Sequence, residues 1–214
     1  MPINVITTVT KAADSYDLTT LAAVKGELEI DVNSKDAVLE QYIGEASTAI
    51  AQYCNQPLVA ETVQDVIYPA RDPQLQVLTG RLAELQLSRW PVIEVVSIVE
   101  NAVTLVEGVD FIVDPKLGKL YRLGTDGRIR QWSAWPKTVQ FRAGFEKIPK
   151  DVAGKAIAMV VKRYAAKGRD PNLRTEDIPG VVSRSWWIAT GGDSGNMPPD
   201  ITDVLDNYRV NVIA

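Results

Sequence analysis

The sequence predicts an α+β protein: a mostly α-helical bundle with an inserted small antiparallel β-sheet domain and an extended C-terminal arm that ends in a helix. Three observations carry this prediction. Apolar residues recur with a helical period in 18–55 and 149–168, the period changes to two between about 62 and 143, and Gly, Pro, Ser and Asp accumulate in 169–197. The expected parts are N-terminal helices in 1–61, a β domain in 62–145, a helix completing the bundle in 146–168, and the arm with its last helix in 169–214.

Two helices are expected before the β domain. The first covers 18–28, and Asp17 and Thr19 are candidates for its N-terminal cap. The second begins after Ser34, whose hydroxyl can accept from free backbone amides, and ends near Asn55, because the proline that follows disfavours helical geometry. Its wide apolar face predicts that it packs in the bundle.

The middle of the chain alternates like strands. In 138–143, Val139 and Phe141 face the opposite way from their polar neighbours, which predicts an antiparallel sheet with one solvated face. Residues 92–99 are rich in β-branched side chains. A hairpin is expected where 111–113 meets 119–123 across a turn that ends in glycine.

Two more helices follow the β domain. One opens at Pro149, a favoured first-turn residue, and closes at Gly168. The last begins at Pro198 and carries apolar residues at helical spacing. Between them the irregular arm contains Trp186 and Trp187, two large aromatic side chains that either fold back onto the core or anchor a partner. We favour the partner contact.

The residue content argues against an enzyme and against any cofactor. The chain has no histidine, so imidazole-based hydrolysis and imidazole metal sites are excluded, and its single cysteine, Cys54, is expected to be a small buried hydrophobe. The tetrapeptide 192–195 (Gly-Asp-Ser-Gly) resembles the nucleophile segment of serine proteases, but without an imidazole we interpret it as a turn. Carboxylate pairs leave a metal-dependent enzyme as a third reading: Glu27 with Asp31, Asp36 with Glu40, and Asp203 with Asp206.

No signal peptide and no membrane span are expected. Residues 1–17 lack a basic stretch followed by an apolar core, and no run approaches the roughly 18 apolar residues of a transmembrane helix. We therefore expect a soluble protein.

Charge is distributed unevenly along the chain. Residues 1–115 carry 6 basic and 17 acidic residues, 116–184 carry 16 and 6, and 185–214 carry 1 and 4. Two interpretations stay open: the parts neutralise each other within one molecule, or they attract one another between copies. The basic stretch alternates with aromatic residues, so a nucleic-acid-binding module in 116–184 is the alternative function, and a sheet with charges on its solvated face is the plain one. The candidate DNA-facing or inter-subunit basic residues are Arg122, Arg128, Arg130, Lys137 and Arg142.

Several phrases of the sequence resemble one protein family. They are Leu18-Thr19-Thr20-Leu21-Ala22-Ala23-Val24-Lys25, Asp36 to Ala46, Asn55-Gln56-Pro57-Leu58, Arg89 to Ile98, Phe141-Arg142-Ala143-Gly144-Phe145, and Ile148-Pro149 with the helix at Ala156-Ile157. With the order of elements, these phrases resemble the head-tail connector, or adaptor, proteins of tailed bacteriophages, in particular the longer members with a β insertion.

The resemblance implies a structural virion protein at the head-tail interface, assembled in the host cytoplasm. It implies that about twelve copies form a ring, that the ring docks on the portal protein and links the DNA-filled capsid to a tail or stopper protein, and that DNA passes through without sequence-specific binding. No cofactor and no membrane are implied. The residues expected to contact the portal or a neighbouring subunit are Arg184, Trp186, Trp187, Ile201, Leu205 and Tyr208.

Overall fold

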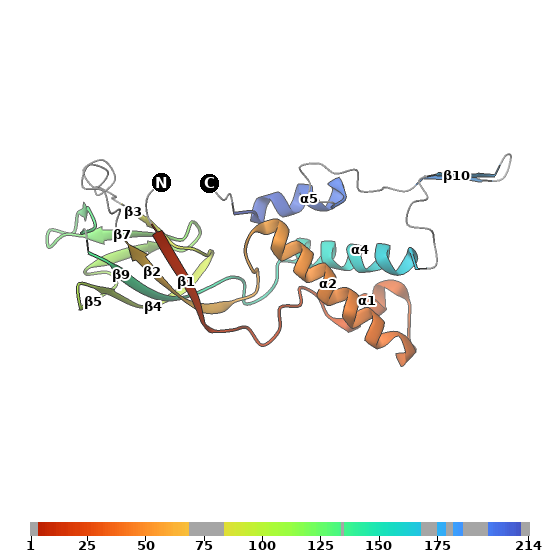
Figure 1. The fold of residues 1–214 in the computed structure, drawn as a ribbon, viewed down its shortest axis with the longest axis horizontal. Helices are drawn as coiled ribbons and strands as arrows, with labels where there is room; N and C mark the ends of the chain where they lie inside the picture. The colour runs from red at the N-terminus through yellow and green to blue at the C-terminus, as the bar shows by residue number, and fades with distance from the viewer. Residues whose placement is uncertain are drawn as a thin grey trace. The chain divides into compact units, whose positions relative to one another are not determined.

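The computed structural model describes residues 4–68, 84–133, 135–167, 175–178, 182–185 and 197–210, with the backbone alone described in 175–178 and 182–185 (Figure 1). The chain forms two compact units. One, here called the β unit, consists of 1–14 and 59–146, and the other, the helical unit, consists of 15–58 and 147–214. Segments of the two units therefore alternate along the chain.

The β unit contains two antiparallel sheets. The first has the order β1-β2-β9-β4-β5, and the second has the order β3-β7-β6 with β8 paired to β7. The strands of the first sheet are β1 (Asn4–Lys11), β2 (Glu61–Tyr68), β9 (Lys137–Ala143), β4 (Val92–Glu100) and β5 (Val103–Leu105). Those of the second are β3 (Glu84–Gln86), β6 (Phe111–Asp114), β7 (Lys119–Leu123) and β8 (Ile129–Arg130).

The inner faces of both sheets supply one hydrophobic core. In β9 the burial alternates as the sequence predicts, with Val139 and Phe141 fully buried and their neighbours partly exposed. The predicted hairpin is also confirmed, since β6 pairs with β7. The core cluster consists of Val63, Ile67, Leu85, Leu87, Val92, Ile98, Leu105, Phe111, Leu120, Trp132, Val139, Phe141 and Ala143.

The helical unit contains α1 (Leu21–Leu28), α2 (Asp36–Cys54), α4 (Lys150–Ala165) and α5 (Pro199–Leu205), with 3-10 turns at Asn33–Lys35 and Asp206–Tyr208. The cap of α1 is Thr20, whose hydroxyl accepts from the backbone N–H of Ala23 at 3.2 Å, and not Asp17 or Thr19 as predicted. At the end of α2, Asn55 adopts the left-handed conformation that closes many helices.

Helices α1, α2 and α4 share a core. Val24, Leu39, Ile43, Ala46 and Val160 are buried at its centre. Leu18, directly before α1, donates its backbone N–H to the Ser47 hydroxyl of α2 at 3.0 Å. The helical periodicity of the sequence therefore predicts these three helices and their buried faces correctly. None of the helices in the described part of the chain is long and apolar enough to cross a membrane.

The predicted fold class is wrong in its emphasis. The chain is α+β, but it is sheet-rich and not a mostly α-helical bundle with a small β insertion. One reason is β1, in a segment that the sequence analysis assigned to the N-terminal helices. Its run Val5-Ile6-Thr7-Thr8-Val9 is almost wholly β-branched, which favours an extended backbone.

The arm also contains regular structure that the sequence analysis expected to be irregular. Strands β10 (Thr175–Ile178) and β11 (Val182–Ser185) pair antiparallel and form a sheet of their own. Charged and polar residues dominate both strands, so the alternation of apolar residues that identifies a half-buried strand is missing.

Candidate functional site

A cluster of charged and polar side chains lies at one end of the β unit, with Glu100, Arg122 and Lys137 buried at its centre. Glu100, the last residue of β4, accepts from Arg122 Nε of β7 at 3.3 Å and from the Ser133 hydroxyl at 2.6 Å. Lys137 of β9 lies 3.9 Å from Glu100 Oε1, the oxygen that accepts from Ser133, and donates to the Ser133 carbonyl at 2.6 Å. Arg122 also contacts the Asp110 carboxylate at 3.2 Å. We call these five residues the Glu100 network.

The network satisfies its own charges. Burial alone would raise the pKa of the Glu100 carboxyl, but hydrogen bonds from Ser133 and the nearby Lys137 and Arg122 cations outweigh burial and hold the pKa below its usual value. Burial lowers the pKa of Lys137, against the attraction of Glu100. A charge set that is fully paired in this way fixes geometry more than it adds stability.

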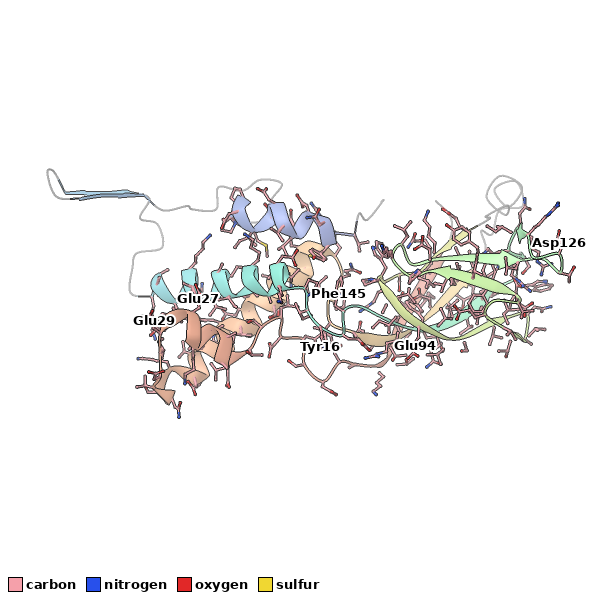
Figure 2. The ribbon with its side chains drawn as sticks, turned by 180° about the vertical axis from the view of Figure 1, so that it is seen from behind. Tyr16, Glu27, Glu29, Glu94, Asp126 and Phe145 are labelled. Atoms are coloured by element: carbon pink, nitrogen blue, oxygen red, sulfur yellow. The ribbon has the colours of Figure 1, made fainter. Side chains whose placement is uncertain are left out.

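Hydrogen bonds of the Glu100 network fix the backbone at Val106 and Trp135, near exposed apolar side chains at the same end of the β unit. Asp110 accepts from the Val106 backbone N–H at 3.0 Å, and Lys137 donates to the Trp135 carbonyl at 2.6 Å. Asp126, in the loop before β8, lies at this end of the β unit in Figure 2. The side chains that are more than half exposed here, which we call the Trp135 end, are those of Val103, Val106, Val109, Ile129 and Trp135.

Such an arrangement is suited to protein contact and not to catalysis. Exposed apolar groups on loops that are already fixed lose little conformational freedom when a partner covers them. The sequence analysis grouped Trp132 and Trp135 as aromatics of one basic stretch, but Trp132 is 4% exposed in the core and Trp135 is 57% exposed. Val103 begins the short strand β5, and Val106 and Val109 lie in the segment that follows it; their spacing of three residues is not the period of a strand, so no sequence signal singles them out.

The five predicted basic residues do not form one surface. Arg122 and Lys137 are buried in the Glu100 network, whereas Arg128 and Arg130 are exposed. Arg142 is partly exposed and pairs with Glu146 at 2.7 Å. This division does not favour the nucleic-acid-binding alternative, because two of the five cations already neutralise carboxylates inside the protein.

The unevenness of charge along the sequence disappears in the folded units. The β unit has 11 basic and 12 acidic residues, and the helical unit has 12 and 15. Ion pairs within the helical unit join the basic helix α4 to acidic segments, as in Lys162 with Asp200 at 2.8 Å and Arg163 with Glu45 at 3.6 Å. Neutralisation within each unit is therefore the interpretation that the structure favours.

The residues predicted to contact the portal or a neighbouring subunit have different surroundings. Ile201 and Leu205 of α5 are fully buried within the chain. Tyr208 donates its hydroxyl to Asp151 of α4 at 2.8 Å, and burial with this carboxylate raises its pKa to about 12. Trp186 and Trp187 lie outside the described residues, and Arg184 belongs to β11, where the backbone alone is described. Their contact role stays a prediction.

No reactive centre emerges from the residues that the structure describes. Within them, no group of three or more His, Cys, Asp or Glu could hold a metal ion. Cys54 is fully buried, which confirms its predicted place in the core, and burial raises the pKa of its thiol to about 11. A thiol of this kind is a poor nucleophile at neutral pH.

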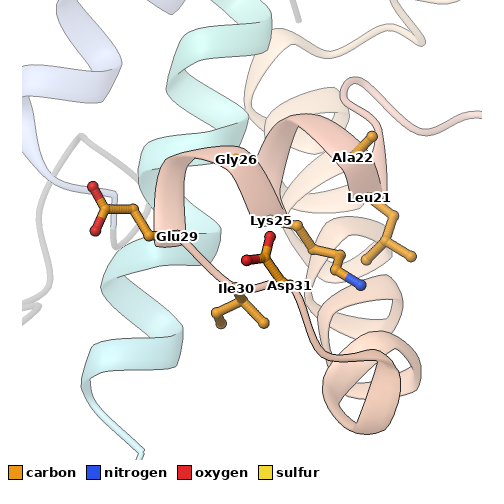
Figure 3. Close-up of a pocket in the computed structure, with 7 residues that line it drawn as sticks. All are labelled: Leu21, Ala22, Lys25, Gly26, Glu29, Ile30 and Asp31. Carbon is orange, nitrogen blue, oxygen red and sulfur yellow. The ribbon is translucent and has the colours of Figure 1, made fainter.

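A hollow of about 630 Å³ lies beside α1 (Figure 3). It is lined by residues from α1 and the loop after it: Leu21, Ala22, Lys25, Gly26, Glu29, Ile30 and Asp31. Lys25 is paired with Asp36 at 2.8 Å. More than half of the lining residues are exposed, so the hollow has the character of a surface depression.

The described part of the chain is thus an α+β fold with an exposed apolar end and without a reactive centre among its described residues. The comparisons with known proteins agree: residues 18–79 match the family described as "Phage gp6-like head-tail connector protein". The predicted resemblance to head-tail connector proteins is thereby confirmed. The matched segment includes α1, α2 and β2.

Two solved structures share the fold. One is "Neck of empty GTA particle computed with C6 symmetry", with a TM-score of 0.55 and 16% identity, and the other is "Virion of native gene transfer agent (GTA) particle", with a TM-score of 0.57 and 15% identity. Each match covers 97% of this chain and 97% of the other. Comparison with curated proteins gives no match.

Proposed function

We propose that this chain is a non-enzymatic head-tail connector subunit in the neck of a phage-like particle. Copies form a ring that docks on the portal and joins the DNA-filled head to the tail or a stopper. The observation that carries the proposal is the connector-family match of 18–79 on a chain whose fold matches a particle-neck structure over 97% of its length.

The site agrees with this role. A junction has to present preformed contact surfaces and hold them against load, and the Glu100 network beneath the Trp135 end provides one such surface. In the described residues, nothing resembles a constellation of nucleophile, base and oxyanion donors. A ring also requires that one surface of a copy meets a different surface of the next.

The C-terminal arm is the part that we assign to the portal or to a neighbouring copy. It carries Trp186 and Trp187 between β11 and α5, and aromatic side chains of this size are frequent anchors of protein interfaces. DNA passes the ring without being read, because the channel of a static junction has no need of base contacts.

The test is a particle preparation in which this chain alone is missing. We expect filled or leaking heads and free tails that do not join, and joining should return when the chain is supplied. Tails that attach normally to stable DNA-filled heads in its absence would refute the proposal. In parallel, mass measurement of the purified chain with and without portal protein shows whether a complex of ring stoichiometry forms.

A further inference from the structure

Strand β1 is an open edge of the larger sheet. It pairs with β2 over Asn4–Lys11, and among the residues that the structure describes no strand lies on its other side in the sheet order β1-β2-β9-β4-β5. An eight-residue edge exposes a row of backbone N–H and C=O groups that can pair with another strand. Proteins normally protect such edges.

The side chains of β1 do not protect it. Val5 is 37% exposed, Ile6 56% and Val9 43%, so apolar groups are accessible on both faces of the strand. The strand has no proline, and its only charged residue is Lys11 at the end.

The opposite edge of the same sheet differs. Strand β5 has three residues, and β4 carries two irregularities, between Val92 and Glu94 and between Val95 and Ser97. Short edge strands and bulges are common devices against unwanted pairing. The edge formed by β5 is therefore short, whereas β1 pairs regularly with β2 from Asn4 to Val9 and has one register shift, between Val9 and Lys11.

The hairpin β10–β11 lacks a third strand in the described part of the chain. Its four residue pairs form a sheet of two strands. A two-stranded hairpin is marginally stable in water, and a third strand is what usually makes it persist. The ten residue-to-residue steps from Ala165 to Thr175 can span about 33 Å when extended, so the hairpin can reach beyond its own helical unit.

We propose that β1 of one copy pairs with the β10–β11 hairpin of a second copy, so that each copy gives a hairpin to one neighbour and receives one from the other. The charges agree: β10 contributes Glu176 and Asp177, whereas β1 has no acidic residue and ends in Lys11. Since the two surfaces are different, repetition of the contact runs head to tail and produces a ring when it closes.

This inference rests on the proposed function and specifies how its ring is held together. It also predicts what the two tryptophans contact. Because Trp186 directly follows β11, exchange of the hairpin would bring it to the neighbouring copy. An exchange of strands adds backbone hydrogen bonds to the side-chain contacts, and those of the paired residues have to break together when the copies separate.

The experiment is thiol crosslinking with a short bismaleimide on a chain that carries Ile6→Cys and Ser183→Cys. The native Cys54 is fully buried, so the introduced thiols react selectively. The reaction is carried out on joined particles and on the purified chain. We expect a ladder of covalent oligomers with both substitutions and no ladder with either one alone.

The outcomes separate this inference from the proposed function. Joined particles that contain the doubly substituted chain but give no ladder would overturn the strand exchange and leave the connector role intact. A crosslink within single chains would overturn it as well, because the hairpin would then pair in its own copy. Absence of the chain from joined particles would refute the connector role, and a ladder in the purified chain would then still support the exchange.

The second variant places a positive charge on strand β1 to disfavour pairing along this edge. Thr8→Lys, added to the chain that carries Ile6→Cys and Ser183→Cys, should reduce the crosslinked fraction about tenfold, equivalent to about 1.4 kcal/mol. The matched control is Val96→Lys in the same chain. It places a lysine at an exposed position of the same sheet, on β4 and not on β1, where Val96 is 55% exposed. An equal reduction in the control would overturn the assignment to β1.

Discussion

Glu100 and Arg122 form a buried ion pair between two sheets. The Arg122 Nε lies 3.3 Å from Glu100 Oε2, and the side chains are 8% and 10% exposed, respectively. Glu100 ends β4 of the larger sheet and Arg122 belongs to β7 of the smaller one. The pair therefore fixes how the two sheets meet at the Trp135 end.

Replacement of Glu100 by glutamine should destabilise the protein by about 3 kcal/mol, because Lys137 and Arg122 would both lose the Glu100 carboxylate and Arg122 would keep only its contact with Asp110 in the network. Denaturant unfolding measures the change. The control is Glu94→Gln in the same strand, where the side chain is exposed (Figure 2) and the expected effect is within 0.5 kcal/mol, roughly the range for surface changes. Equal effects of the two substitutions would show that the network contributes nothing.

Lowering the pH should reduce the free energy of unfolding through protonation of the Glu100 carboxylate. The pKa of Glu100 is lowered in the folded chain, so its contribution is complete above the pKa of an unfolded glutamate, about 4.3, and is lost as the pH falls through the lower folded value. The free energy of unfolding, measured from pH 7 downward, should fall less steeply in Glu100→Gln than in the unmodified chain. Parallel curves would contradict this.

Substitution of Thr20 by alanine should destabilise the helical unit by about 1 kcal/mol, since the Ala23 backbone N–H loses its acceptor. Thr19→Ala is the matched control, and thermal or denaturant unfolding is the measurement. A larger loss in the control would mean that the neighbouring threonine is the cap.

Trp186→Ala combined with Trp187→Ala should leave the unfolding free energy unchanged and weaken docking by about 2–4 kcal/mol, the scale of aromatic interface anchors. Binding of the purified chain to portal protein and to itself is measured by titration. Unfolding of the double variant would show that the pair belongs to the core.

The sequence predicts elements well where periodicity is local. The apolar face of α2 and the alternation of β9 are visible without any partner, because each pattern depends on a single element. Strand β1 is not among the predicted elements, although its β-branched run is a local signal; its pairing with β2 joins segments more than 50 residues apart. Long-range pairing of this kind leaves no mark in a local window.

The candidate site could be predicted only in part. Arg122 and Lys137 have the same sequence appearance as the exposed Arg128 and Arg130, and their burial depends on Glu100. That carboxylate lies 22 residues before Arg122 and meets it through the packing of two sheets. The sequence therefore identifies basic residues without showing which of them are already neutralised.

The interleaving of the two units has a consequence for biosynthesis. Strand β1 leaves the ribosome first, yet the sheet that it borders is incomplete until β9 ends at Ala143. During that interval α1 and α2 are present without α4, which supplies part of their core. A fragment that ends after the β unit therefore contains α1 and α2 without α4. We expect such truncated chains to aggregate unless a chaperone covers the exposed faces of these two helices.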